Sequence, residues 1–310
     1  MQISVSPTAP ETLERLTLLD NGQTVIRHLR NPARTKDTLV VTFAEMLMND
    51  PSAAGFGEKF FLKAGYDLVI VQKRSESWYQ DLKVEDFARV VSGIAAQYRD
   101  VACYGISMGA FAALYFGGSI NASILALSPL CSIHPRYPQL GGQDYRKQVT
   151  ATQCDLADAP RSAKPVFIVF DPRLPLDALY MREEVIPAFP NATIARAPGA
   201  GHPVSRCLNG IGLLGPLVLD FIESQRMPDI AAALRPKRAN SSFWLANLGE
   251  RCARRTRFDT ALSLYDKAIG LASDPAFFVA KRDALIRRHA PVLADRGAIG
   301  GVNRAASSAS

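Results

Sequence analysis

Residues 101–118 read VACYGISMGAFAALYFGG. The apolar run of a buried strand stops at GISMG, residues 105–109, and a second apolar run with the character of a helix begins at once. A serine between two glycines at such a junction can be lifted clear of a sheet on a tight strand-to-helix turn, where bulkier neighbours would collide with the adjacent chain. The bare pattern occurs by chance in roughly one chain of this length in ten, so its weight comes from the strand before it and the helix after it. The stretch therefore predicts that Ser107 is a nucleophile.

Short apolar segments bounded by turn residues recur on both sides of this serine. Residues 84–98 between two of them carry apolar side chains at spacings of three and four, which indicates an amphipathic helix. Alternation of strands and helices predicts an α/β fold, a doubly wound and mostly parallel sheet with its function at the carboxyl ends of the strands. The other expected strands are QTVIRHLR (23–30), TLVVTFA (38–44), DLVIVQ (67–72), ILALSP (124–129), VFIVFD (166–171) and ATIARAP (192–198).

This order of strand, serine turn, helix and later strands resembles the α/β-hydrolase superfamily over roughly residues 20–225. In that superfamily the chain order of the catalytic residues is Ser, then Asp or Glu, then His. The resemblance implies that Asp171, at the end of VFIVFD, is the acid and that His202, in GAGHPV, is the base. Asp177, six residues after Asp171, is the competing acid, and Asp171 could instead be a turn residue.

The other histidines fit these roles less well. His134 also follows an expected strand, but it precedes the acid in the chain, which is the wrong order for the superfamily. His28 lies inside a strand pattern and His289 lies in the basic C-terminal region, so both are expected to be packing or surface residues.

The resemblance also implies a pair of backbone N–H groups that hold an oxyanion. The first is that of Met108, and the second is that of Phe43 or Ala44 after the strand at 38–44, where the usual glycine-rich pair is absent. Trp78 and Tyr79, in the loop after the strand at 67–72, could line a substrate mouth as exposed aromatic residues. Packing over the end of the sheet is an equally good interpretation.

The composition changes after residue 226, where two prolines and a basic cluster follow. We expect a hydrolase domain over 1–226, a linker over 227–242, a helical module over 243–290 and a disordered tail over 291–310. The module resembles one tetratricopeptide repeat in Leu248-Gly249, Ala261, Tyr265 and Ala268. Because such repeats need about three copies to be stable alone, we expect the module to dock on the hydrolase domain or on a protein partner.

The net charge of +7 belongs to this C-terminal region, because residues 234–310 hold 14 Lys and Arg against 6 Asp and Glu. Arg251, Arg254, Arg255 and Arg257 could engage an acidic partner or a membrane surface, although a solvated face is the simpler interpretation. Nucleic-acid binding is not favoured, because Phe258 and Tyr265 are more easily used in the hairpin core.

Other patterns limit the classes of function. The five cysteines are scattered without paired spacing, which is typical of reduced thiols in a cytoplasmic protein. No apolar run approaches the roughly 18 residues of a membrane span, and the N-terminal residues do not read as an export signal. The glycines at 55 and 57 and those at 105 and 109 lack the Walker lysine and the dinucleotide-binding spacing. No metal-ligand spacing occurs either, so no cofactor is expected.

These observations predict a serine hydrolase that cleaves an ester or related acyl bond through an acyl-enzyme on Ser107. The substrate would be a small-molecule or glycan-linked acyl compound. Acyl transfer with the same three residues is one alternative. A non-catalytic scaffold that recruits a protein partner through the C-terminal helices is the other.

Overall fold

The computed structural model describes residues 12–141 and 143–295, which confirm the predicted α/β fold class. Their strands form one eight-stranded sheet in the order β1-β2-β4-β3-β5-β6-β7-β8. β2 runs antiparallel to β1 and β4, and the pairs from β4 to β8 are parallel. The strands are β1 (Glu14–Asp20), β2 (Thr24–Arg30), β3 (Thr38–Phe43), β4 (Asp67–Lys73), β5 (Asp100–Ile106), β6 (Ser123–Leu127), β7 (Val166–Phe170) and β8 (Thr193–Arg196).

Seven of these strands lie where the apolar segments predict them. β3 and β4 are buried along their whole length, because helices cover both faces of the sheet at its centre. β1 was not predicted, because ERLTLLD is an edge strand with mostly exposed side chains and lacks the apolar signal of a buried strand.

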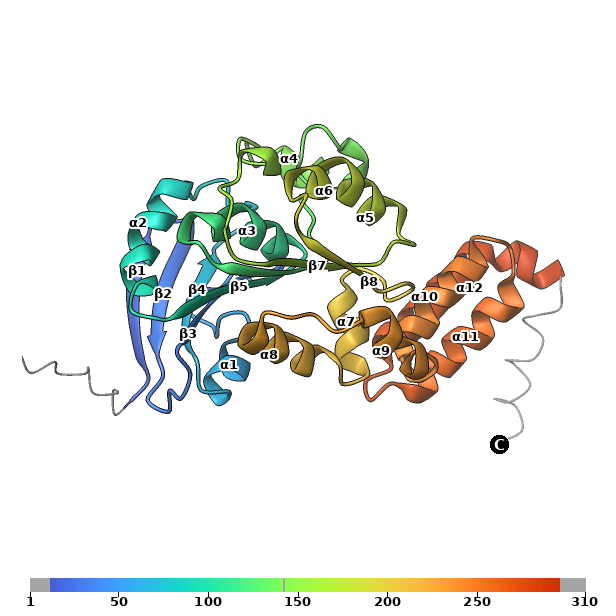
Figure 1. The fold of residues 1–310 in the computed structure, drawn as a ribbon. Helices are drawn as coiled ribbons and strands as arrows, with labels where there is room; N and C mark the ends of the chain where they lie inside the picture. The colour runs from blue at the N-terminus through green and yellow to red at the C-terminus, as the bar shows by residue number, and fades with distance from the viewer. Residues whose placement is uncertain (1–11, 142, 296–310) are drawn as a thin grey trace, which may run out of the picture.

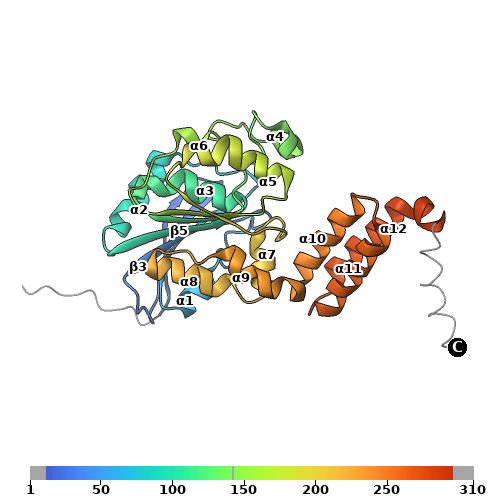
Figure 2. The same cartoon turned by 45° about the vertical axis from the view of Figure 1, so that its right-hand side comes forward.

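Helices cover the two faces of the sheet (Figures 1 and 2). On one face lie α2 (Val84–Ala95), α3 (Met108–Phe116), α4 (Gln143–Arg146), α5 (Pro175–Tyr180) and α6 (Ile186–Ala188), with a π-helical segment, Met181–Val185, joining the last two. On the other face lie α1 (Glu58–Lys63), α7 (Val204–Gly210), α8 (Leu214–Ser224) and α9 (Ile230–Lys237). Short 3₁₀ segments occur at Gly117–Ile120, Pro138–Leu140, Leu156–Asp158 and Arg238–Asn240.

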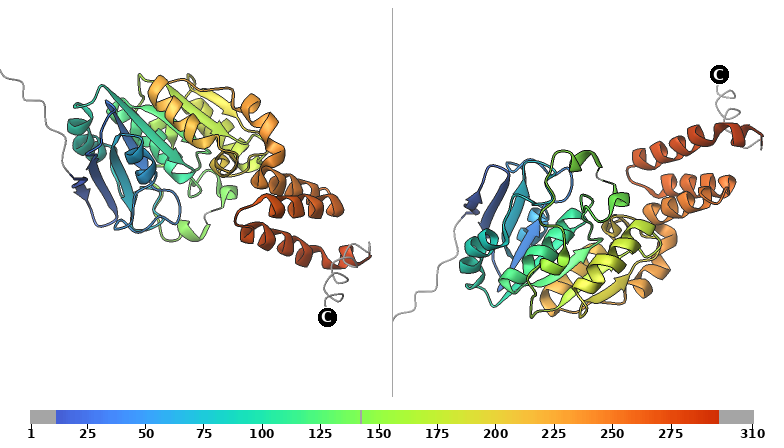
Figure 3. Two further views of the ribbon diagram at one scale, coloured as in Figure 1. Left: turned by 90° about the horizontal axis from the view of Figure 1, so that it is seen from below. Right: turned by 90° about the horizontal axis from the view of Figure 1, so that it is seen from above.

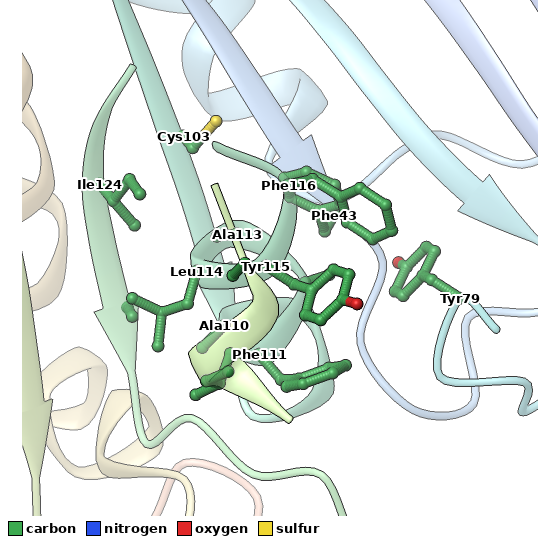
Figure 4. Packing of buried hydrophobic residues seen from close by; sticks show 14 of the residues in the cluster. Phe43, Tyr79, Cys103, Ala110, Phe111, Ala113, Leu114, Tyr115, Phe116 and Ile124 are labelled. Carbon is green, nitrogen blue, oxygen red and sulfur yellow. The ribbon is translucent and has the colours of Figure 1, made fainter. Parts of the chain in front are cut away.

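The core on the α3 face is built around α3 itself, every residue of which is buried. Figure 4 shows the rings of Phe43, Tyr79 and Phe116 gathered on one side of this helix. Phe43 stacks on Phe116 with ring centroids 6.1 Å apart. A helix that is apolar all round has no solvent face, so α3 is fixed against the sheet directly behind Ser107.

The described part of the chain closes with α10 (Ser242–Ala253), α11 (Phe258–Leu271) and α12 (Ala276–Asp295), which lie beside β8 and far from β1 (Figures 1 and 3). A Cβ added at Gly249 would lie 3.1 Å from Ala261 O and 3.3 Å from the Tyr265 ring, so small residues do allow α10 and α11 to approach closely. Likeness to a tetratricopeptide repeat and the division into domains stay predictions.

The segment expected to be a linker, residues 227–242, is not extended. It contains α9, whose Ile230 and Leu234 are buried in the core on the α8 face, because apolar residues four apart share one face of a helix. The predicted disordered tail overlaps α12, which continues to Asp295, and residues 296–310 lie outside the described residues.

All five cysteines are free, and four of them are buried while Cys252 is half-buried. The two histidines expected to be packing or surface residues both contact aromatic rings: His28 Nε2 lies 3.1 Å from Tyr98 Oη, and the His289 ring centroid lies 4.7 Å from that of Phe258. Among the described residues no single helix has the length and apolar character to cross a membrane, and one pair bent by 107°, 204–210 with 214–224, meets those criteria together.

Candidate active site

Ser107 lies on a sharp turn between β5 and α3, as predicted. Its backbone has φ 53° and ψ −114°, a conformation that a residue with a side chain rarely adopts. A Cβ at Gly105 would lie 2.0 Å from Gly109 O, and a Cβ at Gly109 would lie 2.5 Å from Phe43 O. Both glycines are therefore required by the close approach of strand and helix around the serine.

His202 lies on the loop that follows β8, and its Nε2 is 2.8 Å from Ser107 Oγ. Residues 95 positions apart in the chain are thus joined by a hydrogen bond at the carboxyl edge of the sheet. About a quarter of the His202 side chain remains exposed, so a substrate can reach the imidazole.

Asp177, in the first turn of α5, completes this chain of side chains. Its Oδ2 lies 2.8 Å from His202 Nδ1, and its side chain is only 7% exposed. A carboxylate there accepts the Nδ1 proton and leaves Nε2 as the basic nitrogen toward Ser107. The competing acid of the sequence analysis therefore occupies the position that was assigned to Asp171.

The prediction that Asp171 contacts His202 is wrong. Both of its oxygens are taken by backbone N–H groups: Oδ1 accepts from Arg173 and Gly199, and Oδ2 accepts from Gly201, each at 2.9 Å. Asp171 is buried at the end of β7 and holds the loop that carries the histidine. Both aspartates follow the same strand, so spacing alone could not separate the acid from the residue that supports the loop.

His134, the rival base, lies away from Ser107 in a buried ionic cluster. Although no metal-ligand spacing occurs in the sequence, the fold brings one ring nitrogen of His134 and one carboxylate oxygen each of Asp155 and Glu184 within 4.8 Å of one another. The His134 Nδ1 accepts the Arg136 N–H at 3.1 Å, so its proton is on Nε2, 3.3 Å from Asp155. The Arg136 guanidinium binds both carboxylates as well, which compensates part of their negative charge.

The contacts in this cluster lower the pKa of Glu184. Burial raises its pKa, but hydrogen bonds from His134, the Leu156 N–H and Tyr137 outweigh burial and hold the pKa below its usual value. The carboxylate is therefore kept ionised, and the cluster is a structural ion-pair network.

The structure removes one of the three backbone N–H groups that were expected as oxyanion donors. The Ala44 N–H donates to Val71 O at 3.0 Å, so Ala44 is not available for an oxyanion. The Phe43 carbonyl faces Gly109 at the start of α3. The roles of the Met108 and Phe43 N–H groups stay predictions.

Trp78 and Tyr79 do not line a substrate mouth. Their side chains are 1% and 0% exposed, so the prediction of exposed aromatics is wrong and the packing interpretation holds. Trp78 packs on Tyr145, and Tyr79 Oη donates to Ala44 O at 2.7 Å. Tyr79 therefore fixes the turn after β3 from inside the protein.

Glu45, which the sequence analysis did not single out, lies at this site. Burial raises the pKa of its carboxyl group, while the positive charges of Arg206, His202 and Lys73 oppose that rise. Its position directly after an expected strand was the one signal that could have drawn attention to it.

The C-terminal helix α10 packs on the histidine loop. Docking on the hydrolase domain was one of the two expectations for this module, but the sequence did not indicate the loop as the place of contact. Trp244 Nε1 donates to Pro198 O, and Asn247 Nδ2 donates to Gly199 O, both at 3.2 Å. A Cβ on Gly201, whose φ is +85°, would lie 2.3 Å from Asn247 Nδ2. The helical module is therefore fitted against the loop that positions His202.

A cavity of about 290 Å³ lies between this loop and the C-terminal helices, and His202 is part of its lining. Arg206 from α7 lines it from one side, and Arg254, Glu250 and Lys281 line it from the helical module. Nothing in the sequence places these residues together, because they come from helices far apart in the chain.

Comparisons with known proteins find likeness only at the level of structure. No family model and no curated protein sequence matches the chain. An esterase of Pyrococcus furiosus is 13% identical with a TM-score of 0.46, over 70% of this chain and 92% of that one.

Two further solved structures have the same degree of likeness. The capsule O-acetyltransferase of Neisseria meningitidis serogroup A is 12% identical with a TM-score of 0.46, over 67% of this chain and 94% of that one. An α/β serine hydrolase of Xanthomonas campestris is 15% identical with a TM-score of 0.43, over 72% and 99%. At such values the chemistry of this protein has to be argued from its own site.

Proposed function

We propose that this protein is a serine hydrolase that cleaves an ester or related acyl bond through an acyl-enzyme on Ser107. The observation that carries the proposal is the unbroken chain from Ser107 Oγ to His202 to Asp177, with both contacts at 2.8 Å. A nucleophile, a base and an acid that orients the base are the three parts that activation of a serine requires.

The first half of the reaction follows from this geometry. His202 Nε2 takes the proton of Ser107 Oγ as the oxygen attacks the carbonyl carbon, and Asp177 stabilises the imidazolium that forms. The carbonyl oxygen becomes an oxyanion near the start of α3, where the Met108 N–H is the proposed donor. The same Nε2 proton then goes to the alcohol oxygen as its bond to carbon breaks, which leaves the acyl group on Ser107.

The second half repeats these steps with an acceptor. Water loses a proton to His202 as it attacks the acyl-enzyme, and Ser107 recovers its proton when the acid leaves. An acceptor hydroxyl can replace water in the same step, which makes the reaction an acyl transfer. The cavity beside His202 favours this second candidate, because it offers space for an alcohol next to the histidine that would deprotonate it.

The test is the intact mass of the protein after incubation with a fluorophosphonate, which labels only an activated serine. We expect one adduct on the wild type, none on Ser107→Ala or His202→Ala, and an unchanged adduct on Ser92→Ala, which removes an exposed hydroxyl of α2. Folded protein without an adduct would refute the proposal and favour a scaffold.

Substrate and acceptor are then resolved by product analysis. Chromogenic acetyl, butyryl and octanoyl esters report the acyl length that the site accepts. Adding glycerol or a methyl glycoside and measuring free acid against new ester separates hydrolysis from transfer. A constant yield of acid at every acceptor concentration would exclude the transfer reaction.

A further inference from the structure

We propose that the cavity beside His202 binds the alcohol portion of the substrate or acceptor, and that this portion carries an anionic group such as a carboxylate, phosphate or sulfate. The inference rests on the proposed function and adds the substrate class and its orientation. It assigns a binding role to α7 and to the C-terminal helices, which stand outside the Ser107–His202–Asp177 chain.

The orientation follows from the proton that His202 carries. Its Nε2 is the atom that protonates the departing alcohol oxygen, or that deprotonates an acceptor hydroxyl, so the alcohol must lie on the imidazole side of Ser107. His202 lines the cavity of about 290 Å³ between the histidine loop and the C-terminal helices. Because His202 belongs to this lining, the cavity adjoins the imidazole side of the site, where the alcohol portion has to lie.

The charge of the cavity follows from its lining. Arg206, Arg254 and Lys281 contribute three cations, and Glu250 contributes one carboxylate. Glu250 already has partners, because Tyr265 Oη donates to its Oε2 at 3.2 Å and Arg254 Nε lies 3.6 Å from its Oε1. Its negative charge is therefore directed at Arg254 and leaves the other two cations uncompensated.

Arg206 and Lys281 have no carboxylate within 4 Å among the residues that the structure describes. Both instead flank the half-exposed ring of Phe277, with Arg206 Cζ 6.0 Å and Lys281 Nζ 5.8 Å from its centroid. Both cations line the same cavity, so an anion bound there is attracted by each of them. Glu45, whose carboxyl group interacts electrostatically with Arg206, adds a second carboxylate to the region, which then has three cations and two carboxylates.

Matched esters test this inference directly. 3-Acetoxybenzoate and its methyl ester share the acetyl group and a phenolic leaving group, and differ in one charge on the alcohol side. We expect the wild type to show a kcat/KM at least tenfold higher for the anion, a ratio that falls severalfold between 20 mM and 500 mM salt because of screening.

The variants Arg206→Gln and Lys281→Gln should each lower this ratio by a factor of three or more. Lys267→Gln removes an exposed lysine of α11 that does not line the cavity, and should leave the ratio as in the wild type. A ratio near one in the wild type, or one that neither cavity variant changes, would overturn the inference while the hydrolase assignment stands.

A second ester pair tests the orientation. Monophenyl succinate and phenyl pentanoate differ by a charge on the acyl side and share the phenol leaving group, so Arg206→Gln should not change their ratio. An equal response in both pairs would show general electrostatic attraction and would overturn the placement. Absence of turnover with all four esters, together with absence of a fluorophosphonate adduct, would overturn the proposed function and this inference with it.

Discussion

Replacing each of the two aspartates that follow β7 by asparagine, one at a time, separates catalysis from support of the histidine loop. In Asp177→Asn the group opposite His202 Nδ1 loses its charge and can present an amide N–H to the ring, which favours the wrong tautomer. We expect kcat to fall by about 10³–10⁴, which corresponds to about 4–5.5 kcal/mol of transition-state stabilisation. The free energy of unfolding should fall by only about 1–2 kcal/mol, since one hydrogen bond is altered.

Asp171→Asn should show the opposite balance. The amide keeps one oxygen for the Arg173 and Gly199 N–H groups, but its NH₂ then faces the Gly201 N–H, donor against donor. Hydrogen bonds to a charged group contribute about 1.5–3 kcal/mol each, so the free energy of unfolding should fall by about 2–4 kcal/mol. We expect kcat to fall by roughly tenfold, because the loop that carries the histidine is loosened but retained.

Two assays decide the comparison: kcat with a chromogenic acetate ester, and unfolding in urea followed by circular dichroism. If Asp171→Asn loses three orders of magnitude in kcat at wild-type stability, while Asp177→Asn stays within tenfold of the wild type, the assignment of the acid from this geometry is refuted.

Three further predictions concern residues around the site. Asn247→Ala removes a hydrogen bond to the histidine loop, so kcat should fall by about tenfold while KM changes little. The unfolding midpoint should stay within a few degrees of the wild type. A lower midpoint with an unchanged kcat would indicate a purely structural role. Lys73→Met leaves the Glu76 carboxylate, 3.0 Å from the Lys73 ammonium and 8% exposed, without its buried partner, and urea unfolding should show a loss of about 3–5 kcal/mol. Glu45→Gln removes a negative charge that favours the imidazolium form of His202, so the acidic limb of kcat/KM against pH should move by roughly half a unit to lower pH, and a shift to higher pH would contradict this sign.

Local patterns were sufficient for the fold and for the turn that carries Ser107. The strands from β3 to β7 were predictable because helices cover both faces of the sheet at its centre, which requires nearly continuous apolar runs. The glycines that flank Ser107 were predictable because the steric demand of the turn acts within five residues. His202 could be placed because it follows the last apolar segment on a glycine-bounded loop.

Other assignments depended on where side chains point after the chain has folded. Asp171 and Asp177 both follow β7, and only the tertiary structure decides which carboxylate faces the imidazole and which binds the loop. Trp78 and Tyr79 look exposed in a polar segment, yet the fold buries them.

The C-terminal helices show most clearly the difference between what the sequence predicts and what the folded structure reveals. Basic helices after residue 240 could be predicted from the sequence, because residue spacing and charge are local properties. It could not determine that α10 packs on the histidine loop, or that Arg206 and Lys281 flank one ring beside His202. The contacts of Trp244 and Asn247 with that loop, and of Arg206 with Phe277, join residues more than 40 positions apart, and only the packing of the folded chain brings them together.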